Sequence, residues 1–226
     1  MINKSSVKKR RLYYFTQSQW ATEDIVLKRL KISDIKDLND PYELTGYIVN
    51  VNKKKVKNEF KEDISDKYGI ICFSNSYHSM LMWSHYADKH RGICLGFDIC
   101  EDDCFDVIYS ESMTNFQNNF NTPSTPFTLK DLQGILSLKY REWAYEEECR
   151  IYSPFDSSIS HSGFNFEQFG ERLQLREVIF GVQNNTEPAT LIRFIEQYYE
   201  GNIKISKAAL DSNKFRVNIA DATCED

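Results

Sequence analysis

The chain has 226 residues, enough for one domain with a sizeable hydrophobic core. Aromatic residues make up 14% of it, a content typical of packed globular proteins and not of disordered ones. The net charge of −5 excludes a protein that is drawn to nucleic acid by its overall field. Any contact with nucleic acid would need a local basic patch.

The cysteines and the N-terminus indicate where the protein resides. None of the six cysteines is part of a CxxC pair, which argues against a zinc site and a disulfide framework. The basic start MINKSSVKKRR is not followed by an apolar segment, and no apolar run of membrane-spanning length occurs. We therefore expect a cytoplasmic protein without a membrane segment.

In the first third of the chain, short apolar runs alternate with polar segments. Leu12–Thr16 predicts a strand, and Ser18 is a candidate cap for a helix over Gln19–Leu27. The segment that follows the second candidate strand contains Asn-Asp-Pro, which favours a turn. The elements expected next are a strand at Leu30–Ser33, the turn Leu38–Glu43, an exposed helix within Val49–Lys67 and a buried strand at Tyr68–Ser74.

The middle and end of the chain predict further strands around three helices. A helix over Ser79–His90 ends near Gly92, and a second helix begins at Pro188. The apolar stripe of the second helix is formed by Leu191, Ile192, Ile195, Tyr198 and Tyr199. The remaining expected elements are strands at Ile93–Ile99, Phe105–Tyr109, Glu146–Tyr152, Arg176–Gly181, Ile203–Ala208 and Phe215–Ile219, a helix at Leu129–Leu138, and loops at Asn115–Thr128 and Asp156–Gly163.

These elements predict an α+β fold in which a mixed central sheet is flanked by helices. We expect a single domain over residues 12–220, preceded by a basic lead-in of residues 1–11 and followed by a tail of residues 221–226.

Three segments carry a resemblance to a known family. They are LNDPYE at Leu38–Glu43, the run from Cys72 to Asp98, and the W-x-Y-E-x-E-x-R pattern of Trp143–Arg150. In order and spacing the chain resembles the bacterial family of unknown function DUF2971 over roughly residues 12–220. That resemblance implies a family and no activity.

A second resemblance concerns activity. The opening strand, helix and strand, followed by CFS at Cys72–Ser74 and by E-x-E, resemble ADP-ribosyltransferases of the DNA-modifying toxin group. This implies a split sheet, the cofactor NAD, and a small-molecule nucleotide plus a protein or nucleic-acid acceptor as partners, in a toxin or phage-defence effector. The residues implied for the cofactor are Tyr14, Thr16, Ser74 and Arg150, and those implied for catalysis are Glu148 and Glu146. Where many of those enzymes have His or Arg on the first strand, this chain has Tyr13, Tyr14 and Phe15.

The acids of the E-x-E-x-R pattern are the first catalytic candidates. On a strand, Glu146, Glu148 and Arg150 point to one face, and two neighbouring carboxylates can raise one pKa into the range of a general base. The alternative is that Arg150 and Lys139 form surface ion pairs with these acids.

His85 is a further candidate for a general base. Within a helix over Ser79–His90, Asp88 would lie one turn away and could orient the His85 imidazole. The alternative is that this segment supplies a helix cap and hydrogen bonds that stabilise the fold.

Two other classes of function are consistent with the sequence. The carboxylates of Asp40, Asp98, Glu146 and Glu148 could hold a divalent metal ion, as in a metal-dependent nuclease. Alternatively, Asn39 or Asp40 bonds to its own backbone in the turn. Since no complete catalytic motif is present, a non-catalytic binding or sensor module is the third class.

Overall fold

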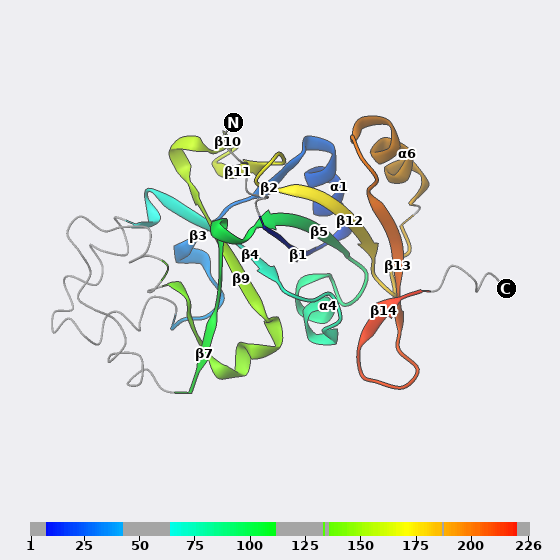
Figure 1. Ribbon diagram of the computed structural model, residues 1–226, viewed down its shortest axis with the longest axis horizontal. Helices are drawn as coiled ribbons and strands as arrows, with labels where there is room; N and C mark the ends of the chain where they lie inside the picture. Colours follow the sequence, from blue (N-terminus) through cyan, green and yellow to red (C-terminus); the bar gives the residue numbers. More distant parts are fainter. Residues whose placement is uncertain (1–7, 43–63, 112–132, 134–135, 187, 221–226) are drawn as a thin grey trace, which may run out of the picture. The chain divides into compact units, whose positions relative to one another are not determined.

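The computed structural model describes residues 8–42, 64–111, 133, 136–186 and 188–220 (Figure 1). These residues divide into two units. Among the described residues, the first unit is built from 8–30, 73–103, 168–186 and 188–220, and the second from 31–42, 64–72, 104–111, 133 and 136–167. The predicted limits of the lead-in, the domain and the tail stay predictions.

A mixed sheet forms the first unit. Its strands are β1 (Lys9–Thr16), β5 (Ile93–Cys100), β12 (Gln174–Phe180), β13 (Lys204–Leu210) and β14 (Val217–Ile219). The pairs β1–β5, β5–β12 and β13–β14 are antiparallel, whereas β12–β13 is parallel. This confirms the prediction of an α+β fold with a mixed sheet.

The period of two along these strands gives the sheet of the first unit two different faces. One face carries Leu12, Leu95, Phe97 and Val178, all of which are fully buried. The other face, which we call the polar face, carries Arg11, Tyr13, Gly96, Asp98 and Glu177, placed side by side by the strand register. At the end of β1 the same face becomes apolar: Phe15 packs edge-on against Trp83, with ring centroids 5.2 Å apart.

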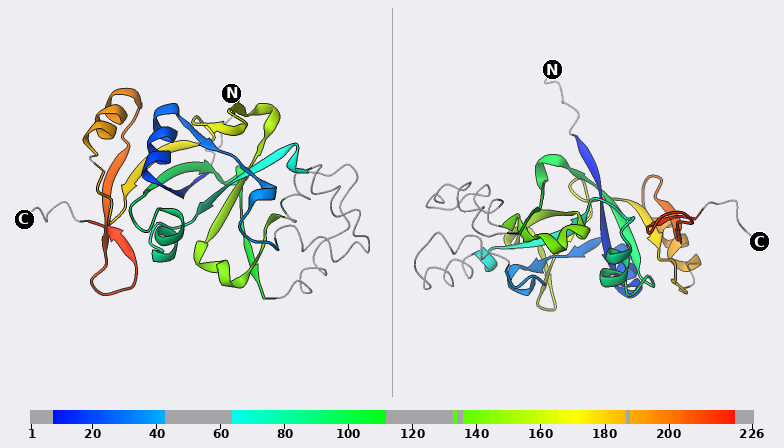
Figure 2. Two further views of the ribbon diagram at one scale, coloured as in Figure 1. Left: turned by 180° about the vertical axis from the view of Figure 1, so that it is seen from behind. Right: turned by 90° about the horizontal axis from the view of Figure 1, so that it is seen from below.

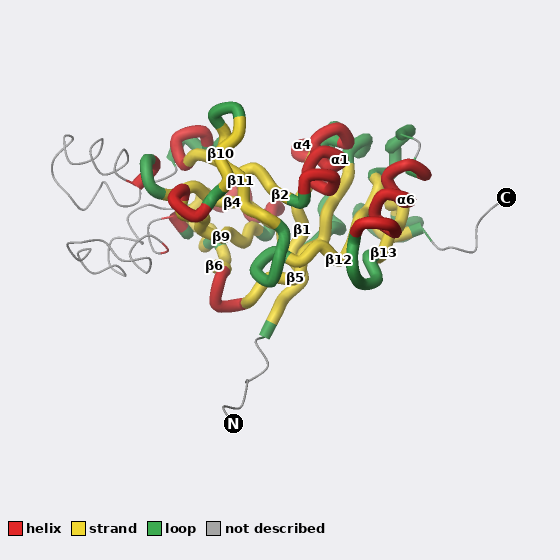
Figure 3. The backbone as a smooth tube through the Cα atoms, turned by 90° about the horizontal axis from the view of Figure 1, so that it is seen from above, coloured by secondary structure: helices red, strands yellow, loops and turns green. Residues whose placement is uncertain are grey.

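Helices cover both faces of this sheet. The helix α1 (Ser18–Leu27) lies above the strands in Figure 1 and α4 (Met80–Tyr86) lies below them, and the same order is visible from behind in Figure 2. Seen from above, α1 and α4 overlap in Figure 3, as expected for helices on opposite faces.

The third helix, α6 (Ala189–Tyr198), packs beside α1. The hydroxyl of Tyr199 donates a hydrogen bond of 2.5 Å to the carbonyl oxygen of Ile25. Of the predicted apolar stripe, Leu191 and Ile195 are buried, while Tyr198 is exposed. No helix in the described part of the chain is long and apolar enough to cross a membrane.

The second unit is built from shorter strands. The longest are β4 (Tyr68–Ser74), whose last two residues belong to the first unit, and β9 (Glu148–Pro154). Antiparallel pairs join β3 (Ser33–Asp34) to β4, β6 (Cys104–Asp106) to β9, and β10 (Ile159–His161) to β11 (Phe164–Gln168), while β7 (Ile108–Ser110) and β8 (Leu138–Tyr140) pair in parallel. Its core contains Ile35, Ile64, Ile70, Leu136 and Tyr152.

Short segments complete the described elements. They are the strand β2 (Arg29–Lys31) and the 3-10 helices η1 (Ile35–Asp37), η2 (Glu101–Asp103), η3 (Arg141–Glu146) and η4 (Phe155–Ser157).

Several predicted elements differ from the structure. The loop predicted at Asp156–Gly163 was wrong, because β10 lies within it and turns into β11 through Ser162 and Gly163, which have φ angles of 52° and 80°. Two consecutive positive φ angles are those of a two-residue hairpin turn. Ser18 does not cap α1 but donates to the carbonyl oxygen of Arg91.

The helix predicted over Ser79–His90 is shorter, since α4 ends at Tyr86 and Asp88, Lys89 and His90 all have positive φ. The predicted helix at Val49–Lys67, the loop at Asn115–Thr128 and the helix at Leu129–Leu138 fall wholly or mostly outside the described residues.

Candidate functional site

The E-x-E-x-R pattern lies in the second unit, at the junction of a 3-10 helix and a strand. The helix η3 ends at Glu146, Glu147 adopts a left-handed conformation with φ 44°, and β9 begins only at Glu148. The predicted strand start at Glu146 was therefore wrong. The turn at Glu147 nevertheless brings both flanking carboxylates to the same cation.

That cation is Lys139, whose ammonium group donates to Glu146 at 2.5 Å and to Glu148 at 3.0 Å. Arg150 donates from Nε to the other oxygen of Glu148 at 2.7 Å and from a terminal nitrogen to the carbonyl oxygen of Leu136 at 2.6 Å. We call Lys139, Glu146, Glu148 and Arg150 the Lys139 network. All four are buried, and Arg150 is 0% exposed.

The charges of the Lys139 network fix its protonation. Burial alone would raise the pKa of Glu148, but Arg150 and Lys139 outweigh it and hold that pKa below the ordinary value. Burial would lower the pKa of Lys139, whereas Glu148 and Glu146 raise it above its usual range. Glu148 and Lys139 therefore both stay charged near neutral pH, and both oxygens of Glu148 are engaged.

This geometry favours the alternative in which Lys139 and Arg150 pair with the acids. The pairs lie in the interior, however, and not at the surface as that alternative assumed. A buried acid saturated by two cations is suited to holding its unit together, since removing one partner leaves an uncompensated charge.

The four proposed metal ligands do not form one site within either unit. Asp98 belongs to the first unit, where it accepts a hydrogen bond of 2.7 Å from Arg11. Asp40 accepts one of 2.8 Å from the backbone N–H of Tyr42, which is the turn geometry foreseen as the alternative. Among the described residues there is no group of three or more His, Cys, Asp or Glu that could hold a metal ion.

The predicted cofactor residues other than Arg150 lie in the first unit, and they pack within it. Tyr14 contacts Phe73 edge-on, with ring centroids 6.0 Å apart. Ser74 is 1% exposed, and its hydroxyl oxygen accepts from the N–H of Ser76 at 3.3 Å. Thr16 is also buried, beside Ile93 in the β1–β5 register. Their role toward NAD stays a prediction.

His85 does not have the helical neighbour proposed for it. The side chain lies exposed in the last turn of α4 and packs edge-on against Tyr86. Because α4 ends before Asp88, that residue turns away and accepts two hydrogen bonds from Arg91, at 3.0 and 3.2 Å. The proposed pairing of His85 with Asp88 was therefore wrong.

A second charged cluster, which sequence reasoning missed, lies on the polar face of the first unit. Glu177 is 4% exposed, and its carboxylate meets Arg11 at 3.4 Å and Lys204 at 3.2 Å. The hydroxyl of Tyr13 donates to the same carboxylate over 3.5 Å, and the rings of Tyr13 and Tyr77 pack edge-on at 5.2 Å. We call Arg11, Tyr13, Tyr77, Glu177 and Lys204 the Glu177 cluster.

Gly96 makes room for this cluster. It is paired with Tyr13 on one side and with Glu177 on the other. A Cβ atom on Gly96 would come within 2.9 Å of the Glu177 Cβ and 3.3 Å of the Arg11 Cδ. Only glycine at this position lets the side chains of Arg11 and Glu177 approach each other across β5.

In the Glu177 cluster the acid lies inside and the cations reach the solvent. The side chain of Glu177 is 5% exposed, whereas those of Arg11 and Lys204 are 34% and 63% exposed. Burial, followed by the charge of Glu177, raises the pKa of both Tyr13 and Tyr77, so both phenols stay protonated at neutral pH. The solvent-exposed charges of the cluster are thus its two cations, of which Arg11 also pairs with Asp98 at 2.7 Å.

His78 extends the aromatic surface next to the Glu177 cluster. Its ring lies 4.1 Å from that of Tyr77, and its Nδ1 is 2.6 Å from the carbonyl oxygen of Val217. A carbonyl oxygen only accepts, so Nδ1 carries a proton and Nε2 of the neutral ring is an acceptor.

The Glu177 cluster was missed because it assembles from four distant parts of the chain. Arg11 and Glu177 are 166 positions apart, and no local spacing joins them. The sequence did contain one indication of the cluster. Arg11 and Glu177 are charged residues inside β-forming segments, and a buried charge in a strand needs a partner.

The comparisons with known proteins support the family and no activity. The model of the family described as "Protein of unknown function (DUF2971)" matches residues 82–151, which confirms the resemblance on the segments from α4 to β9. No curated protein and no solved structure matches the chain. The resemblance to ADP-ribosyltransferases thus gains no support and stays a prediction.

Proposed function

We propose that this protein is a binding or sensor module that takes up a nucleotide at the Glu177 cluster. The observation that carries the proposal is the layering of charge: a buried carboxylate lies beneath cations that face solvent. Exposed cations attract an anion such as a phosphate group.

The other parts of a nucleotide also find partners there. The half-exposed rings of Tyr77 and His78 are suited to stacking on a base. The bond from the Tyr13 hydroxyl to Glu177, at 3.5 Å, is long and easily replaced, so this hydroxyl can donate to a ligand oxygen instead. Aromatic rings, a hydroxyl donor and cations thus lie together on one face.

In the Lys139 network the cations are buried together with the acids. For this reason we favour a binding function at the Glu177 cluster over catalysis by Glu148. A carboxylate that acts on a sugar must reach it, and both oxygens of Glu148 are held by buried cations. A cytoplasmic location is part of the same proposal, since the five cysteines that the structure describes carry free thiols.

Calorimetric titration with ADP tests the proposal. Lys204→Gln should weaken binding by about three- to tenfold, because one exposed charge is lost. The matched control is Lys36→Gln, since Lys36 forms a similar pair with Asp66 at 3.3 Å in the second unit. That variant should bind like the wild type.

A second pair of variants tests the aromatic contact. Tyr77→Leu should weaken ADP binding, whereas Tyr140→Leu, at an exposed tyrosine of the second unit, should not. If neither ADP nor NAD binds at millimolar concentration, the proposal is wrong. Transfer of label from NAD to a cell extract would instead support the transferase predicted from the sequence.

A further inference from the structure

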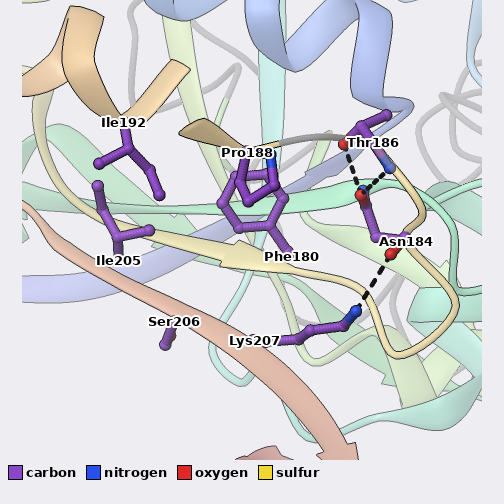
Figure 4. A pocket seen from close by; sticks show the side chains of 8 residues that line it. All are labelled: Phe180, Asn184, Thr186, Pro188, Ile192, Ile205, Ser206 and Lys207. Carbon is purple, nitrogen blue, oxygen red and sulfur yellow. Dashed lines mark hydrogen bonds between the residues drawn. The ribbon is translucent and has the colours of Figure 1, made fainter. Parts of the chain in front are cut away.

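A cleft lies in the first unit between α6, β12 and β13, away from the polar face. Its volume is about 230 Å³, below the range typical of sites for drug-sized ligands. Figure 4 shows the side chains of Phe180, Pro188, Ile192 and Ile205 facing one another across it. These walls are thus apolar, and the cleft is large enough only for a small apolar group.

The polar rim of the cleft is held in place by Asn184. Its amide nitrogen donates to the carbonyl oxygens of Arg91 and Gly92, at 2.6 and 3.1 Å. Its amide oxygen accepts from the N–H and the hydroxyl of Thr186. Because these bonds use the whole side-chain amide, Asn184 fixes the rim and is not itself available to a ligand.

Lys207 is the charged group of the cleft. Its ammonium group donates to the carbonyl oxygen of Asn184 at 3.2 Å, as the dashed line in Figure 4 shows. Within the described residues it forms no ion pair, in contrast to Lys204 on the same strand, which pairs with Glu177. An ammonium group has three donors, so Lys207 can bind a further acceptor.

We infer that this cleft binds a small amphipathic anion, with an apolar body between Ile192 and Ile205 and a carboxylate on Lys207. The two parts of the inference come from separate observations. The apolar walls and the volume favour a small apolar body. The ammonium group of Lys207 at the rim, which has no ion-pair partner among the described residues, favours a negative charge. The inference is independent of nucleotide binding, because the Glu177 cluster lies on the other face of the sheet.

Octanoate is the probe, with octanol as the neutral compound of the same chain length. Titrations followed by methyl NMR should show octanoate shifting the signals of Ile192 and Ile205 and binding more tightly than octanol. Lys207→Met should weaken octanoate about tenfold or more and make the two probes equal.

Lys204→Met is the matched control, because it removes a lysine from the same strand but from the opposite face. It should leave octanoate binding unchanged. Ile192→Phe fills the cleft and should weaken both probes, with the melting temperature reporting that the variant is folded. The inference is wrong if octanoate does not bind at millimolar concentration, if octanol binds equally well, or if Lys207→Met binds octanoate like the wild type.

Discussion

The Lys139 network and the Glu177 cluster use the same residue types in different ways. Each holds a buried glutamate between a lysine and an arginine, and the side chains of Glu148 and Glu177 are both 5% exposed. The cations differ: the side chain of Lys139 is 6% exposed in the network, whereas that of Lys204 is 63% exposed in the cluster. Burial of the glutamate therefore does not distinguish a structural ion pair from a binding site. The exposure of its cations does, because a ligand can bind only to cations that it can reach.

The largest expected effect comes from opening the Lys139 network. Arg150→Met leaves Glu148 with Lys139 as its cationic partner in the interior and should lower the free energy of unfolding by about 3–5 kcal/mol. Urea unfolding measures this. Arg91→Met, which removes an arginine from the exposed pair with Asp88, should leave the midpoint unchanged. A loss as small as that of the control would show that the network does not stabilise the fold.

Crowding of the Glu177 cluster should have the next largest effect. Gly96→Ala places a methyl group 2.9 Å from the Glu177 Cβ and should cost about 1–3 kcal/mol. Gly170→Ala is the control, since a Cβ there meets no atom within 4 Å. Thermal unfolding compares the two variants, and equal melting temperatures would contradict the close packing over Gly96.

Acid should destabilise the protein through Glu148. The pKa of Glu148 is lowered in the folded state, so its contribution is complete above the ordinary value of about 4.3 and is lost as the pH falls toward the folded pKa. Between pH 5 and pH 3 the wild type should lose at least about 1 kcal/mol more stability than Glu148→Gln, which has no charge to lose. Parallel stability curves for the two proteins would exclude this role.

The smallest effect is expected for Tyr13→Phe. The bond from Tyr13 to Glu177 is 3.5 Å long, at the outer limit of a hydrogen bond, so its loss should change stability by less than about 0.5 kcal/mol. Urea unfolding of the variant measures it. A loss above about 1.5 kcal/mol would mean that this hydroxyl is held firmly and is not available to a ligand.

The sequence predicted the buried strands well because their signal is local. Tyr68–Ser74 and Ile93–Ile99 are rich in apolar residues, and the structure confirms a strand at each, the second one extending to Cys100. The hairpin of β10 and β11 was missed because its residues are polar and mostly exposed, although Ser162-Gly163 is a turn signal. The end of α4 was missed because three successive non-glycine residues adopt positive φ, which no propensity predicts.

The candidate sites were harder to predict than the strands. Local spacing correctly placed Glu148 and Arg150 together on β9, but it could not show that Glu146 precedes the strand, that Lys139 lies between the acids or that the group is buried. The Glu177 cluster depends on the pairing of β1, β5, β12 and β13, which is a property of the whole sheet. Such long-range register is not encoded in any single segment.

The most direct test compares the same substitution in the two regions. Glu148→Gln and Glu177→Gln each remove one buried negative charge with little change of shape, and both can be titrated with ADP under conditions in which they are folded. We expect Glu148→Gln to bind ADP within about twofold of the wild type and to be less stable, and Glu177→Gln to bind ADP at least about fivefold more weakly. Loss of ADP binding in folded Glu148→Gln, with unchanged binding in Glu177→Gln, would place the functional site in the Lys139 network and contradict the account.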